Sequence, residues 1–155
     1  MDIMEAVILI GIQASGKTTF YKERFLNTHI RLSLDMLKTR PREMILLRAC
    51  IAAKQAFVVD NTNILKTDRR RYIELAKPAG FRITGYYFQS DVKGVLQRNK
   101  QRTGKAQIPV PGIFGTLKRL QQPSLEEGFD KLYHVSISPS NEFVITEWSD
   151  KVRVQ

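Results

Sequence analysis

The chain has 155 residues, of which 43% are hydrophobic and 26% are charged, close to the usual composition of a globular domain. This composition excludes a disordered or collagen-like chain, and the length fits one domain with a hydrophobic core better than two. The formal net charge is +10, and the distribution of this charge along the chain indicates the kind of partner to expect.

Neither export nor membrane insertion is expected. The longest apolar stretch, residues 6–12, is too short to cross a bilayer, and Asp2 and Glu5 stand where a signal peptide would be basic. The single cysteine, Cys50, cannot form an internal disulfide and lies in an apolar run, so we expect it to be a small core residue. The sequence therefore predicts a cytoplasmic protein with no membrane partner.

Apolar runs alternate with helical patterns along the chain. Strands are expected at residues 7–10, 29–34, 57–59, 81–88 and 131–136. Helices are expected at residues 18–27, 43–54, 68–77, 92–102 and 113–120. This alternation predicts an α/β fold, a three-layer sandwich in which helices flank a mainly parallel sheet. Residues 138–155 are expected to extend the same domain, and their apolar part at 143–145 could form an edge strand.

The strongest motif is GIQASGKT at residues 11–18, which matches G-x-x-x-x-G-K-[ST] between a predicted strand and a predicted helix. In such a loop, backbone N–H groups and the helix N-terminus bind phosphate oxygens, the lysine reaches the β and γ phosphates, and the following hydroxyl ligates Mg²⁺. The motif predicts a P-loop NTPase fold with ATP and Mg²⁺ as cofactors. The residues of this loop expected at the nucleotide are Gly11, Ala14, Ser15, Gly16, Lys17, Thr18 and Thr19, with Thr18 as the metal ligand.

Two acidic residues follow predicted strands. Asp35 comes after the run 30–34 and Asp60 after 57–59, so both are expected at the sheet edge from which the phosphate-binding loop emerges. Asp35 could meet the γ-phosphate there or could equally be a helix N-cap. Asp60 could organise Mg²⁺. The polar run of Asp60, Asn61, Thr62 and Asn63 favours a loop that contacts substrate over a simple turn.

Basic residues are concentrated in the middle of the chain. Residues 38–119 hold 18 of the 25 lysines and arginines but five of the 15 acidic residues, a net charge of +13. A solvated surface is the alternative, but charge separation of this strength favours a polyanion such as phosphate, nucleotide or nucleic acid. Arg98 and Arg102, four residues apart on one predicted helix, could close over transferring phosphate as part of a helical lid at about residues 92–112, or could simply stabilise the helix C-terminus.

Together these features resemble the kinase domain of polynucleotide 5′-kinases, which heal nucleic-acid ends, and of small bacterial P-loop kinases of the same group. The resemblance covers roughly residues 7–135. It rests on the phosphate-binding loop, Leu34-Asp35, the run VVDNTN at 58–63, the pattern Arg98-Asn99-x-x-Arg102, and the run PSLEEGF at 123–129.

The resemblance implies roles on the acceptor side. Asp35 would be the general base that takes the proton from a 5′-hydroxyl, Lys38 would bind the neighbouring acceptor phosphate, and residues 60–63 would lie beside the acceptor. The chain departs from the family pattern by having Ser33-Leu34-Asp35 in place of Asn-Arg-Asp. It also has lysine at position 38 where arginine is usual, which replaces a forked contact with a point charge.

On the donor side, the resemblance implies that Arg98 and Arg102 clamp the donor phosphates and act with Lys17 on the transferring group. The sequence thus predicts one kinase domain at residues 1–137 that transfers the γ-phosphate of ATP to the 5′-hydroxyl end of DNA or RNA. The alternatives are a kinase of the same fold for a nucleoside, sugar or antibiotic hydroxyl, and a non-catalytic ATP-dependent switch that binds nucleic acid. A switch needs no general base, so Asp35 discriminates between the classes. The oligomeric state stays open.

Overall fold

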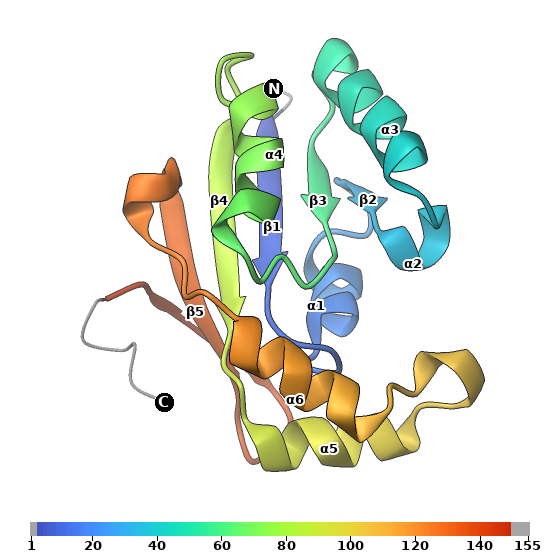
Figure 1. Ribbon diagram of the computed structural model, residues 1–155. Helices are drawn as coiled ribbons and strands as arrows, with labels where there is room; N and C mark the ends of the chain where they lie inside the picture. Colours follow the sequence, from blue (N-terminus) through green and yellow to red (C-terminus); the bar gives the residue numbers. More distant parts are fainter. Residues whose placement is uncertain (1–2, 150–155) are drawn as a thin grey trace.

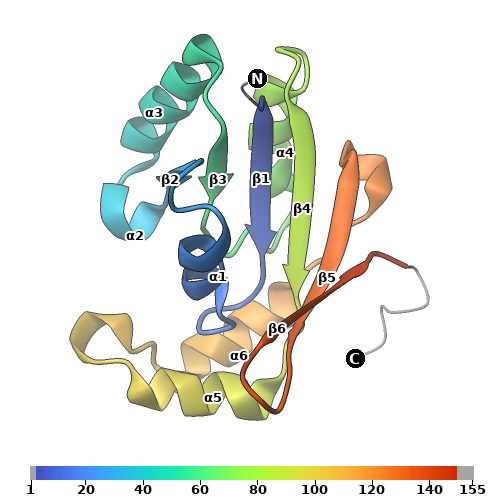
Figure 2. The same ribbon diagram turned by 180° about the vertical axis from the view of Figure 1, so that it is seen from behind.

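The computed structural model describes residues 3–149 (Figures 1 and 2). Six strands form one sheet in the order β2-β3-β1-β4-β5-β6, and all pair in parallel except β6, which is antiparallel to β5. The strands are β1 (Glu5–Ile10), β2 (Ile30–Leu32), β3 (Phe57–Val59), β4 (Arg82–Phe88), β5 (Lys131–Ile137) and β6 (Phe143–Glu147). This mainly parallel sheet confirms the predicted α/β fold. β6 confirms an edge strand in the C-terminal extension, of which residues 150–155 lie outside the described part.

Helices cover both faces of the sheet. They are α1 (Lys17–Arg24), α2 (Leu34–Leu37), α3 (Arg40–Ala53), α4 (Lys66–Ala76), α5 (Val92–Gln101) and α6 (Val110–Arg119), with 3-10 turns η1 (Gly104–Ala106) and η2 (Leu125–Glu127). Figure 1 shows α3 and α4 on one face, Figure 2 shows α1 on the other, and α5 and α6 lie below the carboxyl ends of the parallel strands. Among residues 3–149, no helix is long and apolar enough to span a membrane.

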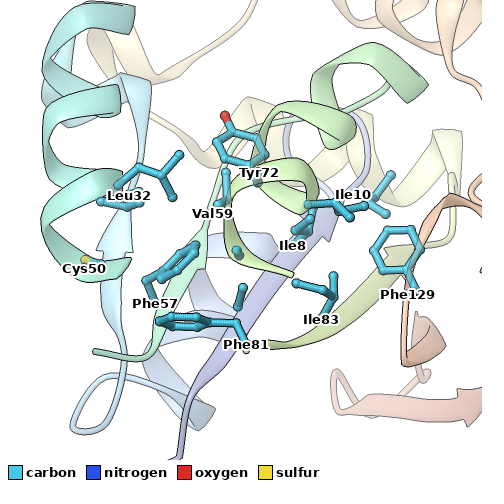
Figure 3. Packing of buried hydrophobic residues seen from close by; sticks show 14 of the residues in the cluster. Ile8, Ile10, Leu32, Cys50, Phe57, Val59, Tyr72, Phe81, Ile83 and Phe129 are labelled. Carbon is cyan, nitrogen blue, oxygen red and sulfur yellow. The ribbon is translucent and has the colours of Figure 1, made fainter. Parts of the chain in front are cut away.

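The core depends on β1, whose side chains are all buried. Ile8 and Ile10 point toward α3 and α4, where they pack in a cluster with Tyr72 (Figure 3). Val7 and Leu9 point to the other face and pack in the cluster of α1. A strand with both faces covered has no solvent-facing side, which explains why residues 6–10 of β1 are all apolar in the sequence. Cys50 is buried in the first cluster, as predicted.

The second strand is shorter than predicted, and this changes the setting of Asp35. β2 ends at Leu32, and Ser33 adopts an extended conformation and caps α2, because its Oγ accepts a hydrogen bond from the Asp35 N–H at 3.3 Å. Asp35 therefore lies in the first turn of a short helix, and Ser33 takes the N-cap position considered for Asp35. α2 ends at Leu37, and its C-cap residue Lys38 has a φ of 73°.

The predicted helix over residues 92–102 is one residue too long. α5 ends at Gln101, and Arg102 is extended with φ −80° and ψ 148°. Asn99 explains the turn that follows: its side chain donates to Ile108 O at 2.7 Å and accepts from Ile108 N at 2.8 Å. The expectation that Arg98 and Arg102 project from one face of one helix is wrong.

A buried carboxylate joins β1 to β4 and to the residue before β2 at the opposite end of the sheet. Glu5 of β1 accepts hydrogen bonds from His29, from Arg82 at 3.0 Å and from Thr84 at 2.8 Å. Burial alone would raise the pKa of Glu5, but the hydrogen bonds outweigh it and lower this pKa from 4.5 to about 2.

This cluster predicts a specific pH dependence of stability. The folded-state pKa of Glu5 is depressed, so its stabilisation is present above pH 4.5 and is lost as the pH falls toward 2. Chemical unfolding of wild type and Glu5→Gln should therefore differ by about 3 kcal/mol near pH 7, with the difference shrinking toward zero near pH 2. The matched control is Glu142→Gln, at an exposed position of the β5–β6 turn. A wild-type–variant difference that stays constant between pH 5 and 2 would contradict the assignment.

Candidate functional site

The phosphate-binding loop joins β1 to α1 at the carboxyl edge of the sheet. Gly16 has a φ of 101°, and a Cβ added there would lie 3.2 Å from the Phe143 ring and 3.3 Å from Ile137. Both the backbone conformation and the close approach of the β5–β6 hairpin therefore require glycine. Thr18 and Thr19 open α1 with exposed side chains.

Lys17 is buried at the centre of this loop. Its Nζ donates to Gly11 O at 2.9 Å, to Ile12 O at 2.7 Å and to Ser15 Oγ at 3.4 Å. Burial lowers the pKa of Lys17 to about 8, while the negative charges of Asp60 and Asp35 oppose the shift and the positive charge of Arg102 adds to it. The loop thus holds a desolvated cation where anionic oxygens are expected.

Asp60 lies beside Thr18, and this pair fits a magnesium site. Thr18 Oγ1 donates to Asp60 Oδ2 at 2.9 Å, and the Asp60 side chain is buried. The described residues contain no group of three or more His, Cys, Asp or Glu side chains suited to a metal. Mg²⁺, however, takes one or two protein oxygen ligands together with substrate phosphates and water, so a hydroxyl and a carboxylate beside a phosphate-binding loop are sufficient.

Arg31 also belongs to this group, which the sequence did not reveal. Its Nε donates to Asp60 Oδ2 at 2.8 Å, and its Nη2 lies 3.5 Å from Thr18 Oγ1. Arg31 stands on β2 and Asp60 follows β3, so sheet pairing brings together residues far apart in the chain. The only sequence signal was a basic residue within an otherwise apolar strand.

Asp35 and Lys38 lie on α2 at the same edge, and both side chains are exposed. The charge of Asp35 reaches Lys17, whose protonated form it stabilises. Asn61 positions this helix, because its Oδ1 accepts from the Leu34 N–H at 2.9 Å. The structure therefore brings an exposed carboxylate close to the phosphate-binding loop.

Thr62 and Asn63 form hydrogen bonds to the backbone at the end of β1 and the start of the phosphate-binding loop. Thr62 O accepts from the Gly11 N–H at 3.0 Å, and the Asn63 side chain donates to Leu9 O at 2.8 Å. Asn63 is buried and has a φ of 49°. These contacts favour a structural role for Asn63 over the substrate contact expected from the sequence.

The lid formed by α5 and α6 is docked on the phosphate-binding loop. Arg98 Nε donates to Ala14 O at 2.9 Å, and Gln13 Nε2 donates to Thr116 Oγ1 of α6 at 3.0 Å. Burial lowers the pKa of Arg98, whereas the Asp91 carboxylate raises it. Asp91 immediately precedes α5, so an acidic residue lies close to Arg98. Arg102 affects the pKa of Lys17, which places its charge near the loop.

A cavity of about 290 Å³ adjoins the loop. Its wall includes Ser15, Asp91 and Arg98, together with Ser136 at the end of β5. It therefore lies between the phosphate-binding loop, the lid and the carboxyl end of the sheet, where a group attached to bound phosphates would find room. Nothing in the sequence marked it, because its wall comes from four separate segments.

The pKa of Lys17 predicts proton uptake when a polyphosphate binds. With a pKa of about 8 the amine is partly neutral at pH 8.5, and anionic phosphates favour its charged form. ATP binding should take up roughly half a proton or more at pH 8.5 and less at pH 7. Calorimetry in buffers of different ionisation enthalpy measures this uptake, and Lys22→Gln, at an exposed lysine of α1, should leave it unchanged. Equal uptake at both pH values would contradict the assignment.

Several known proteins are similar to this chain in sequence or in fold. The chain is 27% identical over 135 residues to the bifunctional polynucleotide phosphatase/kinase of Schizosaccharomyces pombe, with 84% of the chain but 33% of that relative covered. It thus spans about one third of the relative's length. Kti12 from Chaetomium thermophilum, solved with ADP-AlF3, matches with a TM-score of 0.60 at 17% identity over 84% of this chain and 88% of that one. A gluconokinase from Sinorhizobium meliloti matches with a TM-score of 0.59 at 18% identity over 88% and 84%.

These structural matches show that the chain shares its α/β fold with Kti12 and the gluconokinase. A protein-family model described as an AAA domain matches residues 41–122, which is more than half of the chain and begins after the phosphate-binding loop. The matched segment contains Asp60, the α3 and α4 layer and the lid. The chain therefore belongs to the AAA_33 family of AAA domains.

Proposed function

We propose that the protein is an ATP- and Mg²⁺-dependent kinase that transfers the γ-phosphate to the 5′-hydroxyl end of a DNA or RNA strand. The observation that carries this proposal is the meeting of three groups at one sheet edge: buried Lys17, the Thr18–Asp60 pair and exposed Asp35. A loop for donor phosphates, a pair fit for a metal and an open carboxylate are the parts that phosphoryl transfer needs.

On the donor side, Lys17 and the backbone N–H groups at the start of α1 bind the β and γ phosphates. Thr18 and Asp60 would hold Mg²⁺, which neutralises charge on these phosphates when bound. Arg31 orients the Asp60 carboxylate through its hydrogen bond to Oδ2. The cavity beside Ser15 offers space for the nucleoside part of ATP.

Arg98 and Arg102 supply further positive charge to the donor phosphates. Arg98 is already anchored to the phosphate-binding loop through Ala14 O, so its guanidinium is held near the bound phosphates. Arg102 lies just beyond the end of α5, and its charge acts on Lys17. Cations held close to the transferring group stabilise the charge that it carries in the transition state.

On the acceptor side, Asp35 takes the proton of the attacking hydroxyl. The hydroxyl oxygen bonds to the γ-phosphorus while the bond from that phosphorus to the bridging oxygen of ADP breaks, and the Asp35 carboxylate receives the hydroxyl proton. Lys38, the C-cap residue of α2, binds the next phosphate of the strand. Asn61, which accepts from the Leu34 N–H of α2, and Thr62 beside it would lie next to the acceptor.

Two observations favour a polynucleotide acceptor. Residues 38–119 carry a net charge of +13, far more than a neutral sugar would use. The fission yeast relative is named for a polynucleotide substrate. The likeness to a gluconokinase favours the second candidate, a small-molecule kinase with the same donor site.

A screen of acceptors tests the proposal. Wild-type protein with γ-labelled ATP and Mg²⁺ should label single-stranded 5′-hydroxyl DNA or RNA and should leave 5′-phosphorylated strands unlabelled. Nucleosides, sugars and aminoglycosides form the comparison set. Labelling of one of these small molecules with every oligonucleotide left untouched would reject the polynucleotide acceptor and favour the second candidate.

Asp35→Asn tests the general base. The amide keeps the shape of the side chain, and the Ser33 cap keeps α2 in place, so folding and ATP binding should be nearly unchanged. Turnover should fall by about 10²-fold to 10⁴-fold because the proton acceptor is lost. Single-turnover transfer rates and ATP titrations measure the two effects. Near-normal transfer by this variant would assign the proton acceptor elsewhere, and ATP binding by wild type without transfer to any acceptor would favour the non-catalytic switch.

A further inference from the structure

Two arginines from different helices meet at one buried tyrosine on the α3–α4 face. Arg40 of α3 donates from Nη1 to the Tyr72 hydroxyl at 2.8 Å. Arg71 of α4 places its guanidinium carbon 6.0 Å from the centre of the Tyr72 ring. Tyr72 itself is fully buried, so the two cations lie above and beside a ring that solvent does not reach.

Among residues 3–149, the carboxylate that contacts this group is Glu43, and it already accepts three hydrogen bonds. Glu43 is fully buried and accepts from Arg40 at 2.8 Å, from the Tyr72 hydroxyl at 2.9 Å and from Asn61 Nδ2 at 2.8 Å. Burial and the nearby Glu43 charge raise the pKa of Tyr72, so this hydroxyl keeps the proton that it donates. The negative charge of Glu43 is therefore paired with Arg40, and Glu43 forms no ion pair with a second cation among the described residues.

Arg71 has no such counter-charge. No carboxylate in the described part of the chain forms an ion pair with it, although Asp68 and Glu74 each lie one helical turn away. Asp68 uses its carboxylate to cap α4 at the Leu65 N–H. The Arg71 Nη1 atom is buried without a hydrogen-bond partner among the described residues. A partly buried guanidinium with an unsatisfied N–H is costly unless an anion completes it.

The same network leads directly to the proposed general base. Asn61 donates to Glu43 through Nδ2 and accepts from the Leu34 N–H through Oδ1, and Leu34 precedes Asp35 in α2. The two arginines are thus joined to α2 by side chains that contact one another without a break. They lie on the α3 and α4 side of this edge, whereas the phosphate-binding loop lies toward α1 (Figure 1).

We infer that Arg40 and Arg71 form a binding site for a backbone phosphate of the acceptor strand, beyond the phosphate that Lys38 contacts. This inference rests on the proposed function and extends it from the terminal nucleotide to the strand that follows. Two guanidinium groups offer forked N–H donors that match phosphate oxygens, and arginine keeps its charge at any physiological pH. A neutral sugar or a free nucleoside has no phosphate for this site. The acceptor strand accordingly runs from Asp35 over the α3–α4 face.

Arg71→Ala is the direct test, because Arg71 has no protein ion pair to lose. Binding of a fluorescent single-stranded 5′-hydroxyl oligonucleotide should weaken by roughly tenfold, since a charged hydrogen bond is lost. The slope of log affinity against log salt should fall by about 0.7, the value for one phosphate contact on a single strand. Arg71→Lys should keep the slope but bind more weakly, because a point charge replaces the fork.

Arg70→Ala is the matched control. Arg70 is the neighbouring residue on α4, is exposed, and lines a separate cavity with Lys66 and Glu126. It should leave both affinity and salt slope nearly unchanged. Phosphorylation of a nucleoside 3′-phosphate, which has one phosphate for Lys38 and none for Arg71, should show the same KM in wild type and Arg71→Ala.

The outcomes separate this inference from the proposed function. An unchanged salt slope in Arg71→Ala, or equal losses on the oligonucleotide and the nucleoside 3′-phosphate, would overturn the phosphate site while leaving the kinase assignment intact. Tight oligonucleotide binding that depends on Arg71, without any transfer, would support the site and reject the kinase. Failure of wild type to bind the oligonucleotide would overturn the site.

Discussion

The candidate site depends on the register of three parallel strands. Val59 of β3 pairs with Ile8 of β1 on one side and with Leu32 of β2 on the other, so β2 and β3 end at one level and β1 ends two residues later at the same edge. Backbone bonds continue past the strands: Asp60 N donates to Leu32 O, and Gly11 N donates to Thr62 O. A shift by one residue would exchange the faces of β3 and carry Asp60 away from Thr18.

The strands and most helices could be predicted because their signals are local. The apolar run 57–59 predicts a strand, and the pattern of residues 11–18 predicts a phosphate-binding loop, without reference to any other part of the chain. The start of α2 was missed because a four-residue helix has too little periodicity to detect. The position of Arg102 was missed because the helix end depends on Asn99 bonding to a residue nine positions away.

Contacts between side chains far apart in the sequence could not be predicted, for a different reason. Arg31 meets Asp60, and Arg40 meets Tyr72, through strand order and helix packing, and neither spacing has a recurring pattern. Asp60 was correctly expected at the active edge, since the carboxyl end of a parallel strand is a local inference. Its contact with Thr18 could be suggested by analogy only, because β3 had to be placed beside β1 first.

The β5–β6 hairpin has a consequence for the geometry of phosphate binding. Phe143 of β6 lies edge-on to Phe20 of α1 and also adjoins Gly16, so one ring contacts both the loop and the helix that it opens. The Phe143 ring therefore limits the space beside Gly16, in addition to the positive φ that already favours glycine at this position. The conformation of the phosphate-binding turn is therefore supported by a residue of β6, far away in sequence. A fragment containing β1, the loop and α1 without β6 would lack this contact.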